Sequence, residues 1–338
     1  MKMLNFNEIK NEKRSEAAYK AWITINAKKI KKIQEQNAKI EDYIFDPDSK
    51  KIEYGTYIIN PPLIKKSKLT TIEKGGIGKQ LSDGWAINYA VGCTHACRFC
   101  YVDNIHKRYG EKRYGKLVAR AWGNYFLIPS NIDDAIEKTD WSKWKGTEVM
   151  MSSMHDPYLP NLLEITHKIL EKALPYGVNF CIQTRSPLVE KDFPLLIKYK
   201  NQIRIQVSIA TLNNELAKLI EPRVAPPKSR LELIKRAKEY GFDTGVIIAP
   251  VFPPIKIRPS PSEDLELIIK ELAKIKPDHI YGESLHIRGS NMNEIEFALG
   301  EKVNLKNFDQ AIEKIFYNLL MKYNLKGKWW REHSINNF

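Results

Sequence analysis

Three of the four cysteines in this chain of 338 residues lie close together, at Cys93, Cys97 and Cys100. Cysteine thiolates bind soft metal ions and iron–sulfur clusters. A structural zinc site closes its coordination shell with four ligands, and a cluster held by the protein alone also takes four cysteines. Three thiolates would leave one iron of a cubane open to chelate a reactant and pass it an electron. Three clustered thiolates therefore suit an iron–sulfur cubane with one open iron.

A zinc site is the alternative, with His95 as the fourth ligand. His95 lies between two of the cysteines, whereas zinc modules usually take a second pair of ligands from a distant turn. A disulfide fits less well, because three cysteines cannot pair evenly. The fourth cysteine, Cys181, lies far along the chain from the other three.

The chain carries a formal net charge of +14, and 43% of its residues are hydrophobic. The hydrophobic fraction is ordinary for a globular protein, and the positive charge favours a polyanionic partner such as nucleic acid. No run of eighteen apolar residues occurs, and the first residues contain no apolar core followed by a cleavage site. We therefore expect no membrane partner and a cytoplasmic location, where thiols stay reduced.

Short apolar strands alternate with helical segments from Trp85 onward. The sequence predicts strands at 85–91, 148–151, 178–183, 203–207 and 244–250 and from 279, with helices at 161–176, 189–199, 227–240 and 262–275. Strands that alternate with helices form right-handed parallel βαβ units. These units predict an α/β fold, a partial (β/α)6 TIM-like barrel, in which chemistry gathers in the loops after the strands.

The chain divides into three parts in this interpretation. Residues 1–80 form a basic helical N-terminal extension with a connecting segment, residues 81–290 form the barrel, and residues 291–338 form a helical C-terminal extension. The first part is expected to be helical to about residue 42. In the last part, Trp329 and Trp330 lie among cations, where they either stack on bases or are buried against the barrel.

The cysteine spacing resembles that of the radical S-adenosylmethionine (SAM) enzymes, in which an aromatic residue, here Phe99, precedes the last cysteine. Further motifs resemble the spore photoproduct lyase-like branch of that superfamily, and they lie at 87–89, 153–160, 184–186, Ser208 and 221–223. The resemblance covers about half of the chain, from Gly84 to Pro254. It implies a radical SAM partial barrel with a [4Fe-4S] cluster held by the three cysteines. It also implies bound SAM, whose reductive cleavage yields a 5′-deoxyadenosyl radical that abstracts hydrogen.

The resemblance also implies which residues bind SAM. Ser152 and Ser153 would meet its amino group, and Ser208 would reach the methionine or ribose groups. Arg185 stands where the family commonly has lysine, and an arginine can bind the methionine carboxylate through two hydrogen bonds. Phe99 would lie near the adenine.

The remaining residues of these motifs are candidates for the reaction itself. Tyr101 is a candidate hydrogen relay, and Asp156 either contacts substrate or caps the helix that follows. Tyr158 is a further candidate substrate contact. Photoproduct lyase itself has another cysteine beyond the cluster motif that returns a hydrogen atom to the substrate. This chain has tryptophans and methionines in that region, so lyase activity in the strict sense is not expected.

A basic segment leaves the cluster motif directly. It contains one acid, Glu111, two tyrosines, Tyr109 and Tyr114, and six cations, which are Lys107, Arg108, Lys112, Arg113, Lys116 and Arg120. Cations interleaved with aromatic residues suit a surface that follows a nucleic-acid backbone and stacks bases. A solvated helix face is the alternative. Lys107, Arg108, Lys112 and Arg113 are the candidate substrate contacts.

The sequence therefore predicts a radical SAM enzyme, lyase-like or modifying, that acts on DNA or RNA in repair or modification. A peptide or a small metabolite is the alternative substrate. A zinc-containing nucleic-acid-binding protein without catalysis is the alternative of a different class. The radical SAM reaction also predicts an external electron donor, flavodoxin- or ferredoxin-like, as a partner.

Overall fold

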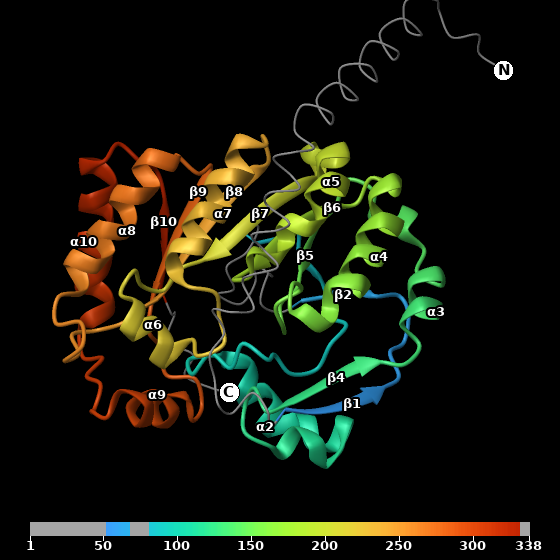
Figure 1. Ribbon diagram of the computed structural model, residues 1–338, viewed down its shortest axis with the longest axis horizontal. Helices are drawn as coiled ribbons and strands as arrows, with labels where there is room; N and C mark the ends of the chain where they lie inside the picture. The colour runs from blue at the N-terminus through green and yellow to red at the C-terminus, as the bar shows by residue number, and fades with distance from the viewer. Residues whose placement is uncertain (1–51, 68–80, 332–338) are drawn as a thin grey trace, which may run out of the picture.

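The computed structural model describes residues 52–67 and 81–331, and its main sheet has the strand order β10-β9-β8-β7-β6-β5-β3-β2 (Figure 1). The centre of this sheet is parallel and consists of β3 (Trp85–Ile87), β5 (Glu148–Met151), β6 (Asn179–Thr184), β7 (Ile203–Ser208), β8 (Asp243–Val251) and β9 (His279–Ser284). β2 (Ile64–Lys66) pairs antiparallel with β3, and β10 (Lys328–Trp330) pairs parallel with β9. Within the described residues the two edges do not pair with each other. The predicted partial (β/α)6 barrel is confirmed.

Helices follow the strands and cover one face of the sheet. They are α4 (Leu163–Ala173), α7 (Pro227–Glu239), α8 (Pro261–Ile275) and α10 (Phe308–Lys322), and the first three lie close to their predicted limits. The start of α8 shows the local cause, because the Ser260 side chain accepts a hydrogen bond from the backbone amide of Glu263. Pro261 then occupies the first turn, where a missing amide hydrogen does no harm.

The helix predicted at 189–199 is wrong over most of its length. One short helix, α5 (Phe193–Leu196), lies between the 3-10 segments Pro187–Asp192 and Ile197–Gln202. Pro187 and Pro194 lack the amide hydrogens that a continuous helix would use, so the segment breaks into short turns.

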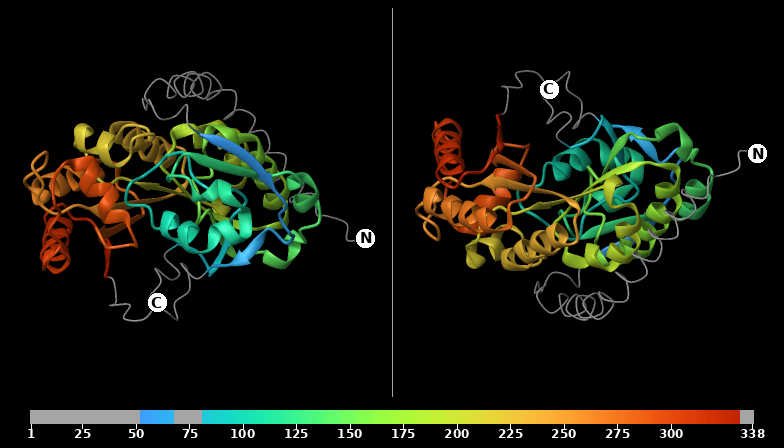
Figure 2. Two further views of the ribbon diagram at one scale, coloured as in Figure 1. Left: turned by 90° about the horizontal axis from the view of Figure 1, so that it is seen from below. Right: turned by 90° about the horizontal axis from the view of Figure 1, so that it is seen from above.

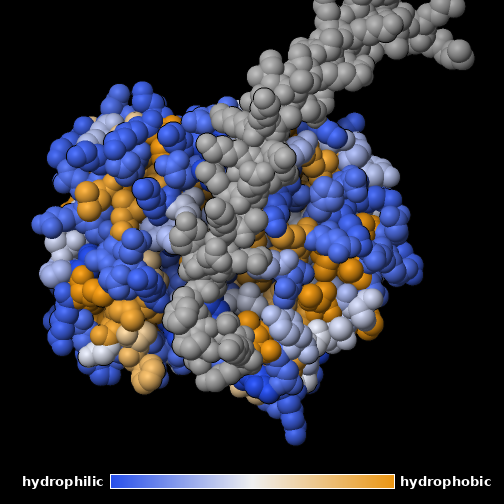
Figure 3. Space-filling model, viewed as in Figure 1, coloured by the Kyte–Doolittle hydropathy of each residue, from blue (hydrophilic) through white to orange (hydrophobic). Residues whose placement is uncertain are grey.

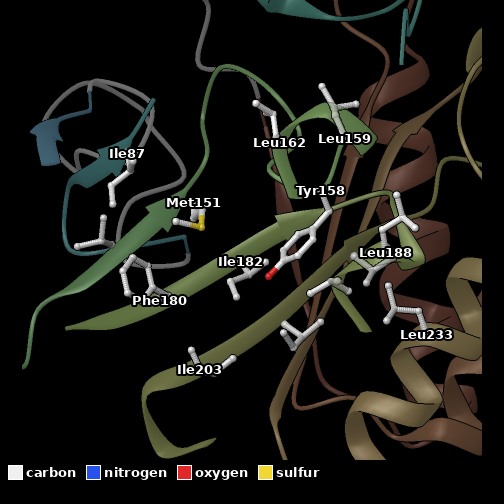
Figure 4. Packing of buried hydrophobic residues seen from close by; sticks show 14 of the residues in the cluster. Ile87, Met151, Tyr158, Leu159, Leu162, Phe180, Ile182, Leu188, Ile203 and Leu233 are labelled. Atoms are coloured by element: carbon white, nitrogen blue, oxygen red, sulfur yellow. The ribbon is translucent and has the colours of Figure 1, made fainter. Parts of the chain in front are cut away.

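The covered side of the sheet is apolar, and we call it the outer face. Its strand residues are Val149, Met151, Phe180, Ile182, Ile203, Ile205, Val207, Val246 and Ile248, all buried in one core with the helices. Figure 4 shows part of this packing, with Met151, Phe180, Ile182 and Ile203 on the strands. Beyond it, the surface over α8 and α10 consists mostly of hydrophilic residues, with scattered hydrophobic ones (Figure 3).

The opposite side of the sheet is the inner face, formed by the alternate strand residues. A smaller apolar cluster lies here and contains Leu81, Ala86, Met150, Ile247 and Ala249. By the same alternation, β6 and β7 present Cys181, Gln183, Arg204, Gln206 and Ser208 to this side.

The connection between β3 and β5 builds much of the end of the barrel where the strands finish. It contains α2 (Tyr101–Tyr114), β4 (Tyr125–Pro129) and α3 (Ile132–Glu137). β4 pairs in parallel with β1 (Glu53–Tyr57) in a separate small sheet that the sequence did not predict. α6 (Asn214–Ile220) and α9 (Asn291–Leu299) lie at the same end as α2 (Figures 1 and 2). The strand predicted at 85–91 ends at Ile87, and Val91 instead bridges to Leu127 of β4.

The outer parts of the chain are described only in part. The helix predicted up to about residue 42 lies outside the described residues. Trp329 of β10 is buried against Phe316 of α10, with ring centroids 5.2 Å apart, so the packing alternative holds for this tryptophan. The division into three parts stays a prediction, although β2 and β10 extend the main sheet. Among the described helices, none has the length and apolar character that crossing a membrane requires.

Candidate active site

The cysteine loop occupies the end of β3 and passes directly into α2, whose N-cap residue is Cys100. Its turns are closed by backbone hydrogen bonds from Ala96 to Cys93 (3.3 Å) and from Cys100 to Cys97 (3.2 Å). Gly92 enters the loop at φ 91°, and a Cβ there would lie 2.5 Å from the backbone oxygen of Tyr125. Only glycine fits this position without strain.

Three free thiols in one short loop fit the donor set of an iron–sulfur cluster, in which each thiolate would bind a different iron. None of the three takes part in a disulfide, and Cys93 and Cys97 are buried. Burial raises the pKa of Cys93 and of Cys100 to about 12. Thiolates in this environment need a positive partner, which iron supplies. In the described chain, no three His, Cys, Asp or Glu side chains are grouped as ligands of one metal ion would be.

Asp156 is buried and joins the loop after β5 to the loop after β6. Its carboxylate accepts hydrogen bonds from the backbone amides of Tyr158 (2.9 Å) and Arg185 (2.6 Å) and from the Thr184 hydroxyl (2.7 Å). The helical turn that follows has no side-chain cap, so the capping alternative is wrong. Because these bonds use both carboxylate oxygens within the protein, the structure gives Asp156 a positioning role.

His95 connects Asp156 to the cysteine loop. Its Nδ1 lies 3.5 Å from an Asp156 oxygen, and both side chains are buried. Burial lowers the pKa of His95, which favours the neutral ring. The imidazole that the zinc alternative needed is therefore held against a carboxylate.

Tyr158, a candidate substrate contact, has a fully buried side chain, and its role stays a prediction. Its side chain is 0% exposed and lies in the outer-face core, as Figure 4 shows. Its hydroxyl donates a hydrogen bond to Asp192 (2.9 Å). A motif position alone did not reveal on which side of the sheet the ring would lie.

The two serines at the end of β5 are fixed by Asn88, which follows β3. The Asn88 side-chain oxygen accepts hydrogen bonds from the hydroxyl of Ser152 (2.9 Å) and the amide of Ser153 (3.0 Å). The Tyr101 hydroxyl donates to the backbone oxygen of Ser153. Burial raises the pKa of Tyr101, so this hydroxyl keeps its proton. The structure thus brings Ser152, Ser153 and Tyr101 together beside the cysteine loop.

Arg185 stands at the end of β6, within a buried group of charges. Its Nε donates to Glu221 (2.9 Å), which also accepts two bonds from Arg230 (2.6 and 3.1 Å). Burial would raise the pKa of Glu221, but the guanidinium groups of Arg230 and Arg185 hold it below the usual value. The Arg185 guanidinium carbon also lies 5.4 Å from the ring centroid of Phe99. Arg185 and Phe99, predicted separately, are therefore neighbours.

Sequence reasoning missed Arg230 as a support for this site, and it missed two glutamines on the inner face. Gln183 donates to the hydroxyl of Ser208 (3.4 Å), and Gln206 is fully buried beside it on β7. The sequence did contain a signal for the glutamine on β7. Buried parallel strands usually read as continuous hydrophobic runs, whereas 203–208 alternates apolar with polar residues.

The basic segment forms α2 and the turn after it, and its cations differ in their surroundings. Lys107 pairs with Asp103 (2.8 Å) and also donates to Ser290, while Arg120 pairs with Glu53. Among the described residues, no carboxylate pairs with the exposed cations Arg108, Lys112 and Arg113. Tyr109 lies among them and is 69% exposed.

Comparisons with known proteins agree with this arrangement. A family model described as the radical SAM superfamily matches residues 87–259. The chain is 58% identical over 294 residues to the uncharacterized protein ORF301 of Acidianus two-tailed virus, which covers 87% of this chain and 98% of that protein. It is 29% identical over 208 residues to an uncharacterized protein of Methanocaldococcus jannaschii, covering 61% and 72%. Spore photoproduct lyase complexed with dinucleoside spore photoproduct has a similar structure, with a TM-score of 0.56 and 14% identity over 82% of each chain.

Proposed function

The chain belongs to the radical SAM superfamily and is a radical SAM enzyme, and on this premise we propose that its substrate is a nucleic acid. The family predicted from the cysteine spacing is confirmed. Membership implies an iron–sulfur cluster and SAM as cofactors. It also contradicts the alternative of a zinc-containing binding protein without catalysis.

In this proposal Cys93, Cys97 and Cys100 hold a [4Fe-4S] cluster. When bound, the cluster would supply the electron for reductive cleavage of SAM, and the resulting radical chemistry would abstract a hydrogen atom from the substrate. A flavodoxin- or ferredoxin-like protein supplies the electron. The Tyr101 hydroxyl, which keeps its proton, is a candidate relay beside the site.

The protein positions SAM through groups that are already held in place. Arg185 is oriented by Glu221 on one side and by the Phe99 ring on the other, which suits a cation that binds the methionine carboxylate. Ser152, Ser153 and Ser208 supply polar groups at the ends of β5 and β7 for the amino and ribose groups. The Phe99 ring would lie near the adenine of SAM at the same end of the barrel.

The observation that carries the nucleic-acid proposal is the exposed face of α2. Arg108, Lys112 and Arg113 lie on neighbouring turns around the exposed ring of Tyr109, with no carboxylate partner among the described residues. α2 begins directly after Cys100, and Arg108 lies about 12 Å along the helix from that cysteine, so a nucleic acid bound on this face would lead toward the cysteine loop. Unpaired cations attract phosphates, and an exposed tyrosine can stack on a base. The structurally similar spore photoproduct lyase supports the proposal further, because its structure was determined in complex with dinucleoside spore photoproduct.

A single experiment tests the class and the substrate together. The protein is loaded anaerobically with iron and sulfide, reduced with dithionite, and assayed for 5′-deoxyadenosine with and without single-stranded DNA or tRNA. We expect brown protein that cleaves SAM faster when one nucleic acid is present. Cleavage without any effect of nucleic acid, and without salt-dependent binding, would favour a peptide or small metabolite instead.

A charge variant gives the matched control. Replacing Arg108, Lys112 and Arg113 by glutamine should reduce the salt dependence of single-strand binding by about 0.7 per lost phosphate contact in log–log slope. The control replaces Lys138, Lys168 and Lys172, each of which pairs with a carboxylate on the surface around α3 and α4. Equal losses in both triple variants would show that net charge alone drives binding, which would remove the special role of α2.

A further inference from the structure

Two carboxamides occupy the inner face of the sheet, at positions where apolar side chains would stabilise the fold more. Gln183 of β6 and Gln206 of β7 are partners in the parallel register, and Gln206 is 0% exposed. The side-chain oxygen of Gln183 and the side-chain nitrogen of Gln206 are buried and have no hydrogen-bond partner among residues 52–67 and 81–331. A buried amide without a partner destabilises a fold. Their neighbours on this face, Met150 and Ile247, show that the site accepts apolar side chains.

The other polar atoms of this pair are already engaged. The Gln183 nitrogen donates to Ser208 (3.4 Å), and the Gln206 oxygen accepts from the thiol of Cys181 (3.4 Å). Each side chain is therefore held at one end and leaves the other end free, one as an acceptor and one as a donor. The next residue in the row is Gly245, where a Cβ would lie 3.1 Å from Gln206. The missing side chain leaves Gln206 room beside β8.

The two carboxamides lie further from the C-terminal ends of the strands than the proposed SAM site does. Gln183 of β6 precedes Arg185, the residue directly after this strand, by two positions, a rise of about 7 Å. Arg185 in turn touches Phe99 of the cysteine loop. A group that enters the inner face from the end of the barrel would therefore meet Arg185 first and the two carboxamides next.

We propose that Gln183 and Gln206 bind the hydrogen-bonding edge of an unstacked nucleobase that enters the inner face. This inference rests on the proposed function. A free acceptor beside a free donor matches the adjacent donor and acceptor that a base presents, and glutamine pairs with bases in this way. An enzyme that acts on a base must take it out of the stack, and one acceptor beside one donor matches a single base. In this division of roles α2 binds phosphates and the two glutamines select the base.

The test is base preference measured by fluorescence anisotropy. The probes are single-stranded homopolymers of dA, dC and dT, added to cluster-loaded protein in the presence of SAM. Wild-type protein should prefer one homopolymer. In Gln206→Leu and in Gln183→Leu, the ratio of the dissociation constants for the other homopolymers and the preferred one should fall about tenfold, as expected for one lost base contact. The dependence of binding on salt should stay as in the wild type, because α2 is unchanged.

Gln202→Leu is the matched control, because its carboxamide donates to the backbone oxygens of Leu174 and Val178, both at 3.0 Å, away from the inner face. It should lower the urea midpoint and keep the base preference, whereas Gln206→Leu should hold or raise the midpoint and lose the preference. Salt-dependent binding in which Gln206→Leu keeps the wild-type preference, or in which the wild type has none, would overturn this inference and leave the proposed function standing. No salt-dependent binding of any homopolymer would overturn both.

Discussion

The outer and inner faces of the main sheet are built from the same strands, yet they differ in almost every residue. On β7, Ile203, Ile205 and Val207 pack against helices, whereas Arg204, Gln206 and Ser208 face the other way. Arg204 donates a hydrogen bond to Glu148 (2.7 Å), at the end of the barrel away from the cysteine loop. A shift of one residue along the strand separates groups that stabilise the fold from groups that can bind and react. Changes on one face should therefore leave the other face's property largely intact.

The largest effect is expected at the rim of the inner face. Cys97→Ala removes one of the three proposed cluster ligands and should abolish both the visible iron–sulfur spectrum and SAM cleavage. Thermal unfolding of the iron-free protein should change little, because the outer-face core is untouched. Spectra of the reconstituted protein and a 5′-deoxyadenosine assay measure the loss.

Cys181→Ala is the control for this variant, because it removes the fourth cysteine from the inner face without touching the loop. It should keep the spectrum and the cleavage. Cleavage retained by Cys97→Ala, or a cluster lost in Cys181→Ala, would show that the ligands are assigned wrongly.

Glu221→Gln comes next, since it alters a buried charge at the same rim. The glutamine would leave the buried guanidinium groups of Arg185 and Arg230 without a negative partner. Breaking a buried ion pair from one side costs about 3–5 kcal/mol of unfolding free energy. Urea unfolding measures the loss, and a raised KM for SAM would show that Arg185 has also lost its orientation. A normal KM in a destabilised variant would limit Glu221 to a structural role.

A truncation on the outer face should show the reverse pattern. Ile205 is 0% exposed, so Ile205→Ala should lower the unfolding free energy by about 2–5 kcal/mol through the cavity it leaves. The folded fraction should bind iron and cleave SAM as the wild type does. Leu267→Ala, at a position 55% exposed on α8, is the control and should change stability by far less. Loss of cleavage by folded Ile205→Ala would contradict the separation of the two faces.

The sequence predicts the elements whose signals are local. The cysteine spacing and the alternation of strands and helices lie within short windows, and the structure contains the predicted order of strands, with the segment 189–199 as the exception among the helices. The family resemblance singled out Arg185, and the structure places it directly after β6, although its role in binding SAM stays a prediction.

What the sequence did not reveal depends on contacts between distant residues. Tyr158 stands in the same motif as Asp156, but its ring packs against β6 and the segment around Asp192 on the outer side. Arg230 supports Arg185 only through Glu221, a contact between segments that are far apart in sequence. The two glutamines were visible as polar residues in buried strands, yet only the register places them side by side.

The last prediction concerns the pH dependence of stability. Buried histidines beside the inner face cause it, and the apolar residues of the outer face do not titrate. In the loops beside the inner face, burial lowers the pKa of His155 to about 3, and it lowers that of His106 on α2 to about 4. Because both folded values lie below the ordinary value of about 6.5, the unfolded chain binds more protons as the pH falls, and stability is lost on acidification. Each histidine should remove about 1.4 kcal/mol per pH unit below 6.5, or about 2 kcal/mol by pH 5. Urea midpoints at pH 7.5, 6.5 and 5 measure this slope. His155→Gln should reduce it by about one histidine's share, and an unchanged slope would mean that the ring takes up its proton without unfolding.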